Sequence, residues 1–201
     1  MFVALAACGD SKPDATAVPA AIPAAEAVAA DAVVADYYPL AIGNRWSYAC
    51  SVEGQPQVRK QLEITRGTKI LDHPGFVATY TVNGEPSEVF LWADPDSMVH
   101  RALTADGQLD EVVGARKAAI GDPIGELRIA RVAKQSTTAT GEIDVLVAEN
   151  FAFDEPSSSP QHRADWVGQF FAEGIGLVAE ADGLGGECEL VAYSVSGRKG
   201  P

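Results

Sequence analysis

Short apolar or alternating runs, separated by turn residues roughly every eight to twelve positions, fill the chain beyond residue 36, a pattern typical of antiparallel all-β domains. We predict strands at residues 45–53, 57–66, 68–72, 75–83, 87–93, 97–103, 109–113, 125–134, 141–149, 175–181 and 187–195. Residues 166–171 fit either a short helix or a strand. No repeat of fixed period is present, which argues against a solenoid or a propeller.

The turns between these runs have specific chemistry. Asn83-Gly84 and Asp106-Gly107 supply the positive φ that tight hairpins require. In Asp94-Pro95-Asp96, proline presets one dihedral angle and aspartate bonds to the local backbone. The glycine-rich segment 183–186 lacks the Lys-Ser/Thr of a phosphate-binding loop and is interpreted as the last hairpin. The serine- and proline-rich stretch 151–163 is expected to be a loop.

Three of the strands are apolar at both odd and even positions, namely 89–93, 145–148 and 190–193. In a sheet with one face in water, apolar and polar positions alternate, so both faces of these strands must be shielded. Either two sheets and a helix enclose these strands, or one face lines an internal apolar groove. The sequence predicts an all-β or mainly β domain: an antiparallel curved sheet, half-barrel or sandwich, with at most one or two short helices.

Composition and charge limit the function. The chain has 201 residues, 47% of them hydrophobic, which is enough to fill one core. Its net charge of -13 would repel a phosphate backbone, so nucleic acid is not an expected partner. No run of about 18 uncharged apolar residues occurs, and a transmembrane helix is therefore not expected.

The amino terminus carries a short motif, Leu5-Ala6-Ala7-Cys8, which resembles the lipobox of bacterial lipoproteins. The resemblance implies cleavage before Cys8 and a diacylglycerol on its thiol. Residues 1–7 hold no Lys or Arg and are short for a signal peptide, so we expect the true start to lie upstream. The alternative is an apolar stub with a free thiol.

Residues 8–36, rich in alanine and proline and free of aromatic residues, are expected to be a disordered tether. The predicted organisation is a truncated signal peptide (1–7), the acylated cysteine with its tether (8–36) and one antiparallel β domain (37–201). By the same resemblance, Gly9 is not the aspartate that commonly retains lipoproteins in an inner membrane. The expected location is the bacterial cell envelope, anchored by lipid and facing the periplasm, with the outer membrane favoured if there are two.

Three cysteines become an even number once Cys8 is lipidated. Cys50 lies in the first predicted strand and Cys188 in the last, and we predict a structural disulfide between them in an oxidising compartment. The alternative is two buried thiols that never meet. No cysteine or histidine pair has the spacing of a metal site, so no metal and no cofactor is expected.

Two further segments, 36–48 and 171–178, resemble the opening and closing signatures of a diffuse group of bacterial envelope lipoproteins and secreted proteins of mostly unassigned activity. Trp46 and Tyr48 would share one face of a strand, and Gly174 and Gly176 would let the chain bend. These residues are therefore interpreted as framework. Proteins of this general kind often resemble concave half-barrels that carry lipids across the periplasm.

No catalytic residue is predicted. No serine or cysteine stands in a nucleophile elbow near the histidines, which we interpret as ordinary surface or strand residues: His73, His100 and His162. Four aspartates lack the spacing of an EF-hand loop and are interpreted as a solvated acidic face: Asp94, Asp96, Asp106 and Asp110.

Binding, and not catalysis, is the expected role. The first hypothesis is a carrier of a hydrophobic or lipid ligand, with four aromatic side chains as candidate ligand contacts: Phe90, Trp92, Trp166 and Phe170. The second is a docking or assembly subunit for another envelope protein, suggested by Trp166, Phe170 and Phe171, which we expect to be exposed. A hydrolase with a spatially assembled site is the third and weakest alternative.

Overall fold

The computed structural model describes residues 37–52, 54–108, 110–150 and 166–200. The predicted signal segment, Cys8, the tether, the loop at 151–163 and His162 lie outside the described residues. Among the residues that are described, no helix has the length and apolarity that crossing a membrane requires.

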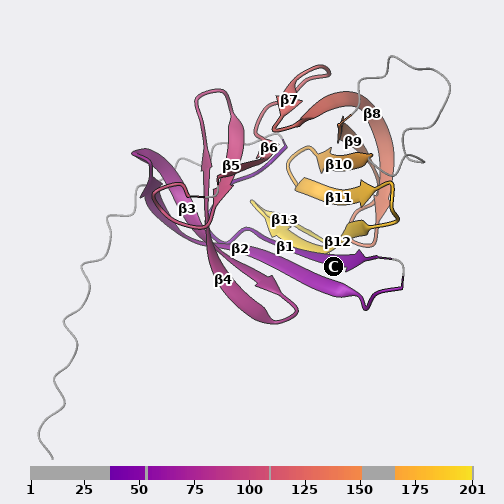
Figure 1. Cartoon of the computed structure of the whole chain (residues 1–201), viewed down its shortest axis with the longest axis horizontal. Coiled ribbons are helices and arrows are strands. Elements are labelled where there is room, and N and C mark those ends of the chain that lie inside the picture. The colour runs from indigo at the N-terminus through magenta and orange to yellow at the C-terminus, as the bar shows by residue number, and fades with distance from the viewer. Residues whose placement is uncertain (1–36, 53, 109, 151–165, 201) are drawn as a thin grey trace, which may run out of the picture.

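The described chain forms antiparallel strands joined by turns and contains no helix (Figure 1). The strands are β1 (Arg45–Ser51), β2 (Val58–Ile70), β3 (His73–Val82), β4 (Glu85–Ala93), β5 (Met98–Ala102), β6 (Glu111–Ala115), β7 (Pro123–Ile124), β8 (Leu127–Thr137), β9 (Gly141–Glu149), β10 (Val167–Ala172), β11 (Gly176–Asp182), β12 (Glu187–Val195) and β13 (Arg198–Gly200). The predicted all-β class and curved antiparallel sheet are confirmed.

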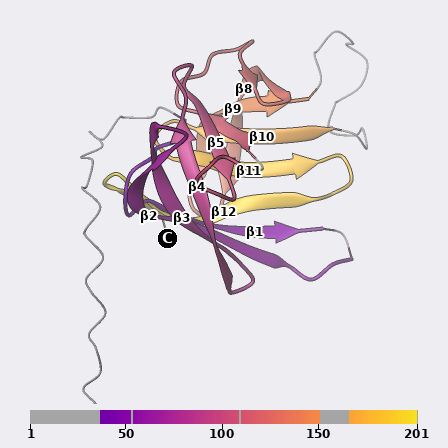
Figure 2. The same ribbon diagram turned by 60° about the vertical axis from the view of Figure 1, so that its left-hand side comes forward.

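The strands belong to one sheet with the order β6-β5-β4-β3-β2-β1-β12-β11-β10-β9-β8-β7, and β13 pairs with β12. The first strand therefore pairs with β12, and a meander of neighbours extends from each side of this pair (Figure 2). The sheet curves so strongly that the two outer strands, β6 and β7, come into contact. A single sheet thus shields its own inner face.

The three strands that are apolar on both faces are largely buried, as predicted. Of the two alternatives for what shields them, enclosure by two sheets and a helix is wrong. All four residues at 145–148 are buried, because the coiled sheet packs against itself on either side of β9. At the centre, the Trp46 indole donates a hydrogen bond from Nε1 to the carbonyl of Ile175 at 2.7 Å. The Tyr48 hydroxyl, on the same face, donates to the carbonyl of Leu177 at 3.0 Å.

Several predicted boundaries are wrong. β2 runs unbroken through the two strands predicted at 57–66 and 68–72, because Gly67 stays in the ladder opposite Phe76 and a bulge falls between Ile64 and Arg66. The segment 166–171, which fitted either a helix or a strand, forms the strand β10. The short strands β7 and β13 were not predicted. The turn at Asn83-Gly84 is confirmed, with φ of 50° and 91°.

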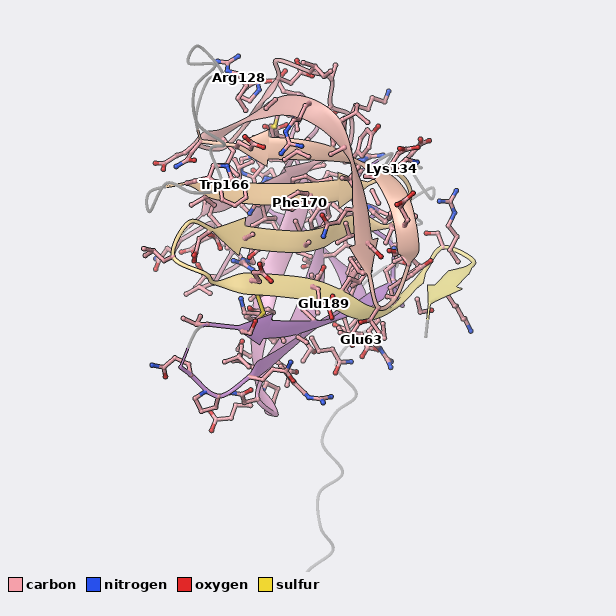
Figure 3. All side chains as sticks on the ribbon, turned by 90° about the vertical axis from the view of Figure 1, so that its right-hand side faces the viewer. Glu63, Arg128, Lys134, Trp166, Phe170 and Glu189 are labelled. Carbon is pink, nitrogen blue, oxygen red and sulfur yellow. A yellow bond between two sulfur atoms is a disulfide. The ribbon has the colours of Figure 1, made fainter. Side chains whose placement is uncertain are left out.

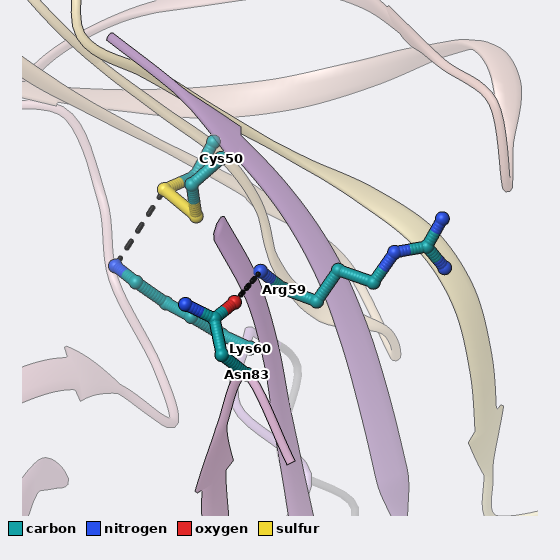
Figure 4. Close-up of a disulfide and its surroundings, with 5 residues drawn as sticks. Cys50, Arg59, Lys60 and Asn83 are labelled. Carbon is teal, nitrogen blue, oxygen red and sulfur yellow. Dashed lines mark hydrogen bonds between the residues drawn. A yellow bond between two sulfur atoms is a disulfide. The ribbon is translucent and has the colours of Figure 1, made fainter. Parts of the chain in front are cut away.

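The predicted disulfide between Cys50 and Cys188 is confirmed. The two residues lie directly opposite each other on β1 and β12, with their Cα atoms 3.9 Å apart and a sequence separation of 138. The Lys60 ammonium lies 3.6 Å from the Cys188 sulfur (Figure 4). The bridge joins the two strands from which the rest of the sheet extends.

Replacing both bridging cysteines with alanine (Cys50→Ala, Cys188→Ala) is expected to lower the free energy of unfolding by about 3–5 kcal/mol, because closing so long a loop restricts the unfolded chain. Urea unfolding followed by far-UV circular dichroism measures the change. Wild-type protein treated with a reductant is the control and should unfold at the lower urea concentration of the variant. Unchanged unfolding in both samples would contradict a structural bridge.

Candidate functional site

A groove of about 670 Å³ lies between the C-terminal end of β8 and the strands β10, β11, β12 and β1. It is lined by Ala49, Ser51, Gln57, Gln135, Ser136, Trp166, Phe170, Ala179, Glu180, Ala181, Asp182, Glu187, Cys188 and Glu189. We call it the acidic groove, because its described lining includes four acidic residues and no lysine or arginine. Its volume falls in the range of small-molecule and peptide pockets.

Strand register determines which side chains face the groove. Ala179 pairs with Glu189 and Ala181 with Glu187, so these four side chains share one face. Side chains alternate along a strand, and those of Glu180 and Cys188 therefore point to the opposite face and contribute main chain to the lining. Glu187 and Glu189 are thus the strand carboxylates that the groove presents.

The arch of β8 forms the opposite wall. The hairpin turn after β8 lies against β12, where the Thr138 hydroxyl donates to Oε1 of Glu189 at 3.0 Å. The backbone N–H of Ala139 donates to the carbonyl of Leu190 at 3.3 Å. These bonds set the distance between the arch and β12, and so the width of the groove.

The turn at the end of β11 is also fixed by a carboxylate. Oδ1 of Asp182 accepts hydrogen bonds from the backbone N–H groups of Leu184 and Gly186, both at 2.8 Å. This confirms the hairpin predicted at residues 183–186. Asp182 therefore has a structural role at the edge of the groove.

The floor of the groove is aromatic. Trp166 and Phe170, two of the predicted ligand contacts, line it together and lie within the arch of β8 (Figure 3). The Trp166 ring covers Gly168 so closely that a methyl group there would collide with the indole. The two aromatic side chains are 2% and 8% exposed, so they form a packed base below a polar rim.

Sequence reasoning erred on the exposure and grouping of the aromatic residues. Phe171 is also buried, so the expected exposure of Trp166, Phe170 and Phe171 is wrong. The other two predicted ligand contacts, Phe90 and Trp92, lie on β4 in the other half of the sheet, packed with Ile70 and Ala102. They do not belong to the groove.

Two buried polar atoms near the floor have no hydrogen-bond partner within the described parts of the chain: Nε1 of Trp166 and Oε2 of Glu149. Glu149 pairs across the ladder with Gly168, the residue under the Trp166 ring, so both atoms lie in one neighbourhood. The other oxygen of Glu149 accepts a hydrogen bond from Arg131 at 2.8 Å. An unmatched donor and an unmatched acceptor thus remain beside the groove.

A second polar cluster surrounds His100 on β5. Its Nε2 lies 3.1 Å from Asp94 and its Nδ1 lies 3.0 Å from Asp110, while the ring stacks on Trp92 with 4.9 Å between centroids. Two of the aspartates predicted to form a solvated face therefore hold a histidine, because the turns before and after β5 both reach its ring. Both ring nitrogens are already engaged by carboxylates.

Within the described parts of the chain, no group of His, Cys, Asp and Glu could hold a metal.

The inner face of the sheet is packed, with Trp46, Ile64 and Leu190 buried on it. Burial raises the pKa of Tyr38 to about 12, and burial also raises the pKa of Tyr48 well above its ordinary value. Both phenols are therefore neutral at physiological pH. The Arg101 guanidinium lies 5.5 Å from the centre of the Tyr80 ring.

The Arg131–Glu149 pair is asymmetric, and this asymmetry can be tested. The side chain of Glu149 is fully buried, whereas that of Arg131 is 34% exposed. Arg131→Met should lower the free energy of unfolding by about 3 kcal/mol, because it leaves a buried carboxylate unpaired. Glu149→Gln should cost about 1 kcal/mol, because water reaches the remaining guanidinium. Urea unfolding of both variants provides the comparison, and a larger loss in Glu149→Gln would contradict this account.

Comparison with known proteins gives a likeness in fold. No family model matches the chain, and no curated protein matches its sequence. A solved structure from Bacteroides fragilis, described as an exported protein with a YmcC-like fold, superposes with a TM-score of 0.52 at 10% identity, over 80% of this chain and 99% of the other. A protein from Parabacteroides distasonis, described as a lipoprotein, gives a TM-score of 0.44 at 8% identity, over 79% and 99% of the two chains. The chain therefore shares the architecture of the Bacteroides fragilis protein.

Proposed function

We propose that this chain is an exported lipoprotein, anchored through Cys8, whose single β domain docks another envelope component in the acidic groove. The lipobox-like segment Leu5-Ala6-Ala7-Cys8 supports the anchor. The disulfide between Cys50 and Cys188 supports an oxidising compartment, since such bridges are rare in reducing ones. The domain then faces the periplasm, on the outer membrane where the cell has two.

The groove itself is the observation that carries the docking role. Its carboxylates stand on a paired strand of the sheet, and its walls add the amides of Gln57 and Gln135 and the hydroxyl of Ser51. Such a surface recognises a polar partner by charge and hydrogen bonding. The lining residues include no histidine and no free thiol that could serve as a base or nucleophile, which favours binding over catalysis.

A carrier of a hydrophobic or lipid ligand is the second candidate. The floor formed by Trp166 and Phe170 favours it, because aromatic side chains provide apolar contact area. The polar rim argues against a lipid carrier, since an acyl chain offers no cation and no hydrogen-bond donor to the Glu187 and Glu189 carboxylates. The docking role is therefore preferred.

The anchor is tested with Cys8→Ser. Without its thiol the chain has no attachment point for diacylglycerol, and we expect it to leave the membrane pellet and appear in the released envelope fraction. Immunoblots of fractionated cells, compared with wild type, measure the distribution. A variant that remains in the pellet would argue against lipid anchoring.

Docking is tested by photo-crosslinking in the cells that naturally make the protein. A photoreactive side chain replacing Gln135, in the groove wall, should give a discrete adduct that mass spectrometry identifies as an envelope component. The same side chain replacing the exposed Lys69 on β2 is the control and should give none. Equal or absent labelling at both positions would contradict docking. A non-covalent acyl lipid found by native mass spectrometry would instead support the carrier.

A further inference from the structure

We propose that the acidic groove recognises an extended, basic segment of polypeptide, an inference that rests on the docking role above and names the chemistry of the partner. Two independent observations lead to it. One is the spacing and sign of the carboxylates on β12, and the other is the unmatched indole N–H of Trp166.

The carboxylates repeat at the interval of an extended chain. Glu187 and Glu189 are alternate residues of one strand on one face, about 7 Å apart at the rise of a β-strand. Alternate side chains of an extended peptide have the same spacing, so two lysines or arginines can each meet one carboxylate. Among the described residues, the lining holds no lysine or arginine that would compete. The net charge of -13 also attracts a basic partner.

The indole N–H distinguishes a peptide from a simple polycation. Trp166 lines the groove, is 2% exposed, and its Nε1 has no acceptor among the described residues. A buried donor without an acceptor is unfavourable, so a ligand that supplies an acceptor gains affinity without breaking an existing bond. A peptide carbonyl is such an acceptor. A fully protonated polyamine has donors only and cannot fill this role.

The groove walls fit the same partner. The side chains of Gln57 and Gln135 each offer a donor and an acceptor, as does the hydroxyl of Ser51. A peptide backbone also presents donors and acceptors in alternation, and each can pair with the walls. Polar groups that would stay unpaired beside an acyl chain are thus satisfied by a peptide.

The probe is a fluorescein-labelled, end-blocked peptide of alternating lysine and alanine, titrated into the oxidised full chain carrying Cys8→Ser at near-physiological ionic strength. Fluorescence anisotropy measures the dissociation constant. The double variant Glu187→Gln, Glu189→Gln should weaken binding about tenfold, from the loss of two partly exposed ion pairs. Glutamine at position 189 retains an oxygen for the Thr138 hydroxyl.

A matched control removes the same charge elsewhere. Glu85 and Glu126 are exposed acids that do not line the groove, so Glu85→Gln with Glu126→Gln should change the dissociation constant less than twofold. If this control weakens binding as much as the groove variant, only net charge attracts the peptide, and the proposal is overturned. No measurable binding to the wild-type chain would also overturn it.

Trp166→Phe tests the hydrogen bond. It keeps an aromatic floor and removes the N–H, so it should weaken binding of the peptide about fivefold while leaving competition by spermine unchanged. The smaller ring leaves part of a buried site unfilled and should also lower the free energy of unfolding, so binding is compared under conditions where both chains are folded. Equal weakening for peptide and spermine would show that only cation density is recognised, and this also overturns the proposal.

The two proposals fail separately. An adduct at Gln135 in cells combined with no peptide binding would overturn the basic segment alone and leave docking standing. No adduct at Gln135 and no peptide binding would remove the groove from the function altogether.

Discussion

The pairing of β1 with β12 is the interaction on which the rest of the structure depends. It joins the two ends of the described chain in the middle of the sheet, and each half of the sheet extends from it as a sequential meander. The disulfide between Cys50 and Cys188 holds the pair in register, and the buried hydrogen bond from Trp46 to the Ile175 carbonyl ties β1 to the start of β11, the strand beyond β12. Without the pairing of β1 with β12, each of these strands would be an exposed edge strand. The two meanders would then have no fixed orientation relative to each other.

The groove is a consequence of curvature and not of a dedicated loop. β8 is long enough to arch over its neighbours, and the turn that follows it reaches β12 through Thr138 and Ala139. The apolar positions of β9 and β10 lie under the arch as a packed floor, and the polar positions nearest its open side become the rim. One strand pattern therefore supplies both the core and the candidate binding surface.

Sequence patterns predicted the fold well where the signal was local. Alternation and turn chemistry placed β1, β4, β9, β11 and β12, and the position of the two cysteines in the first and last predicted strands indicated their bridge. The groove could not be predicted in the same way, because Glu187, Gln135 and Trp166 meet only through the closure of the sheet. Phe90 and Trp92 resemble Trp166 and Phe170 in chemistry, and nothing in their local sequence reveals that they lie in the other half. The exposure of the aromatic residues was wrong for the same reason.

The separation of β1 and β12 in sequence also shapes how the domain must fold. Their bridge spans 138 residues, so the central ladder cannot form until nearly the whole domain is available. Non-local antiparallel sheets fold slowly, because the entropy of closing a long loop is lost before its contacts are gained. A chain built in this way remains loose during synthesis and acquires its native closure late. The ladder between β1 and β12, and the disulfide across it, are therefore completed only after both meanders can be brought together.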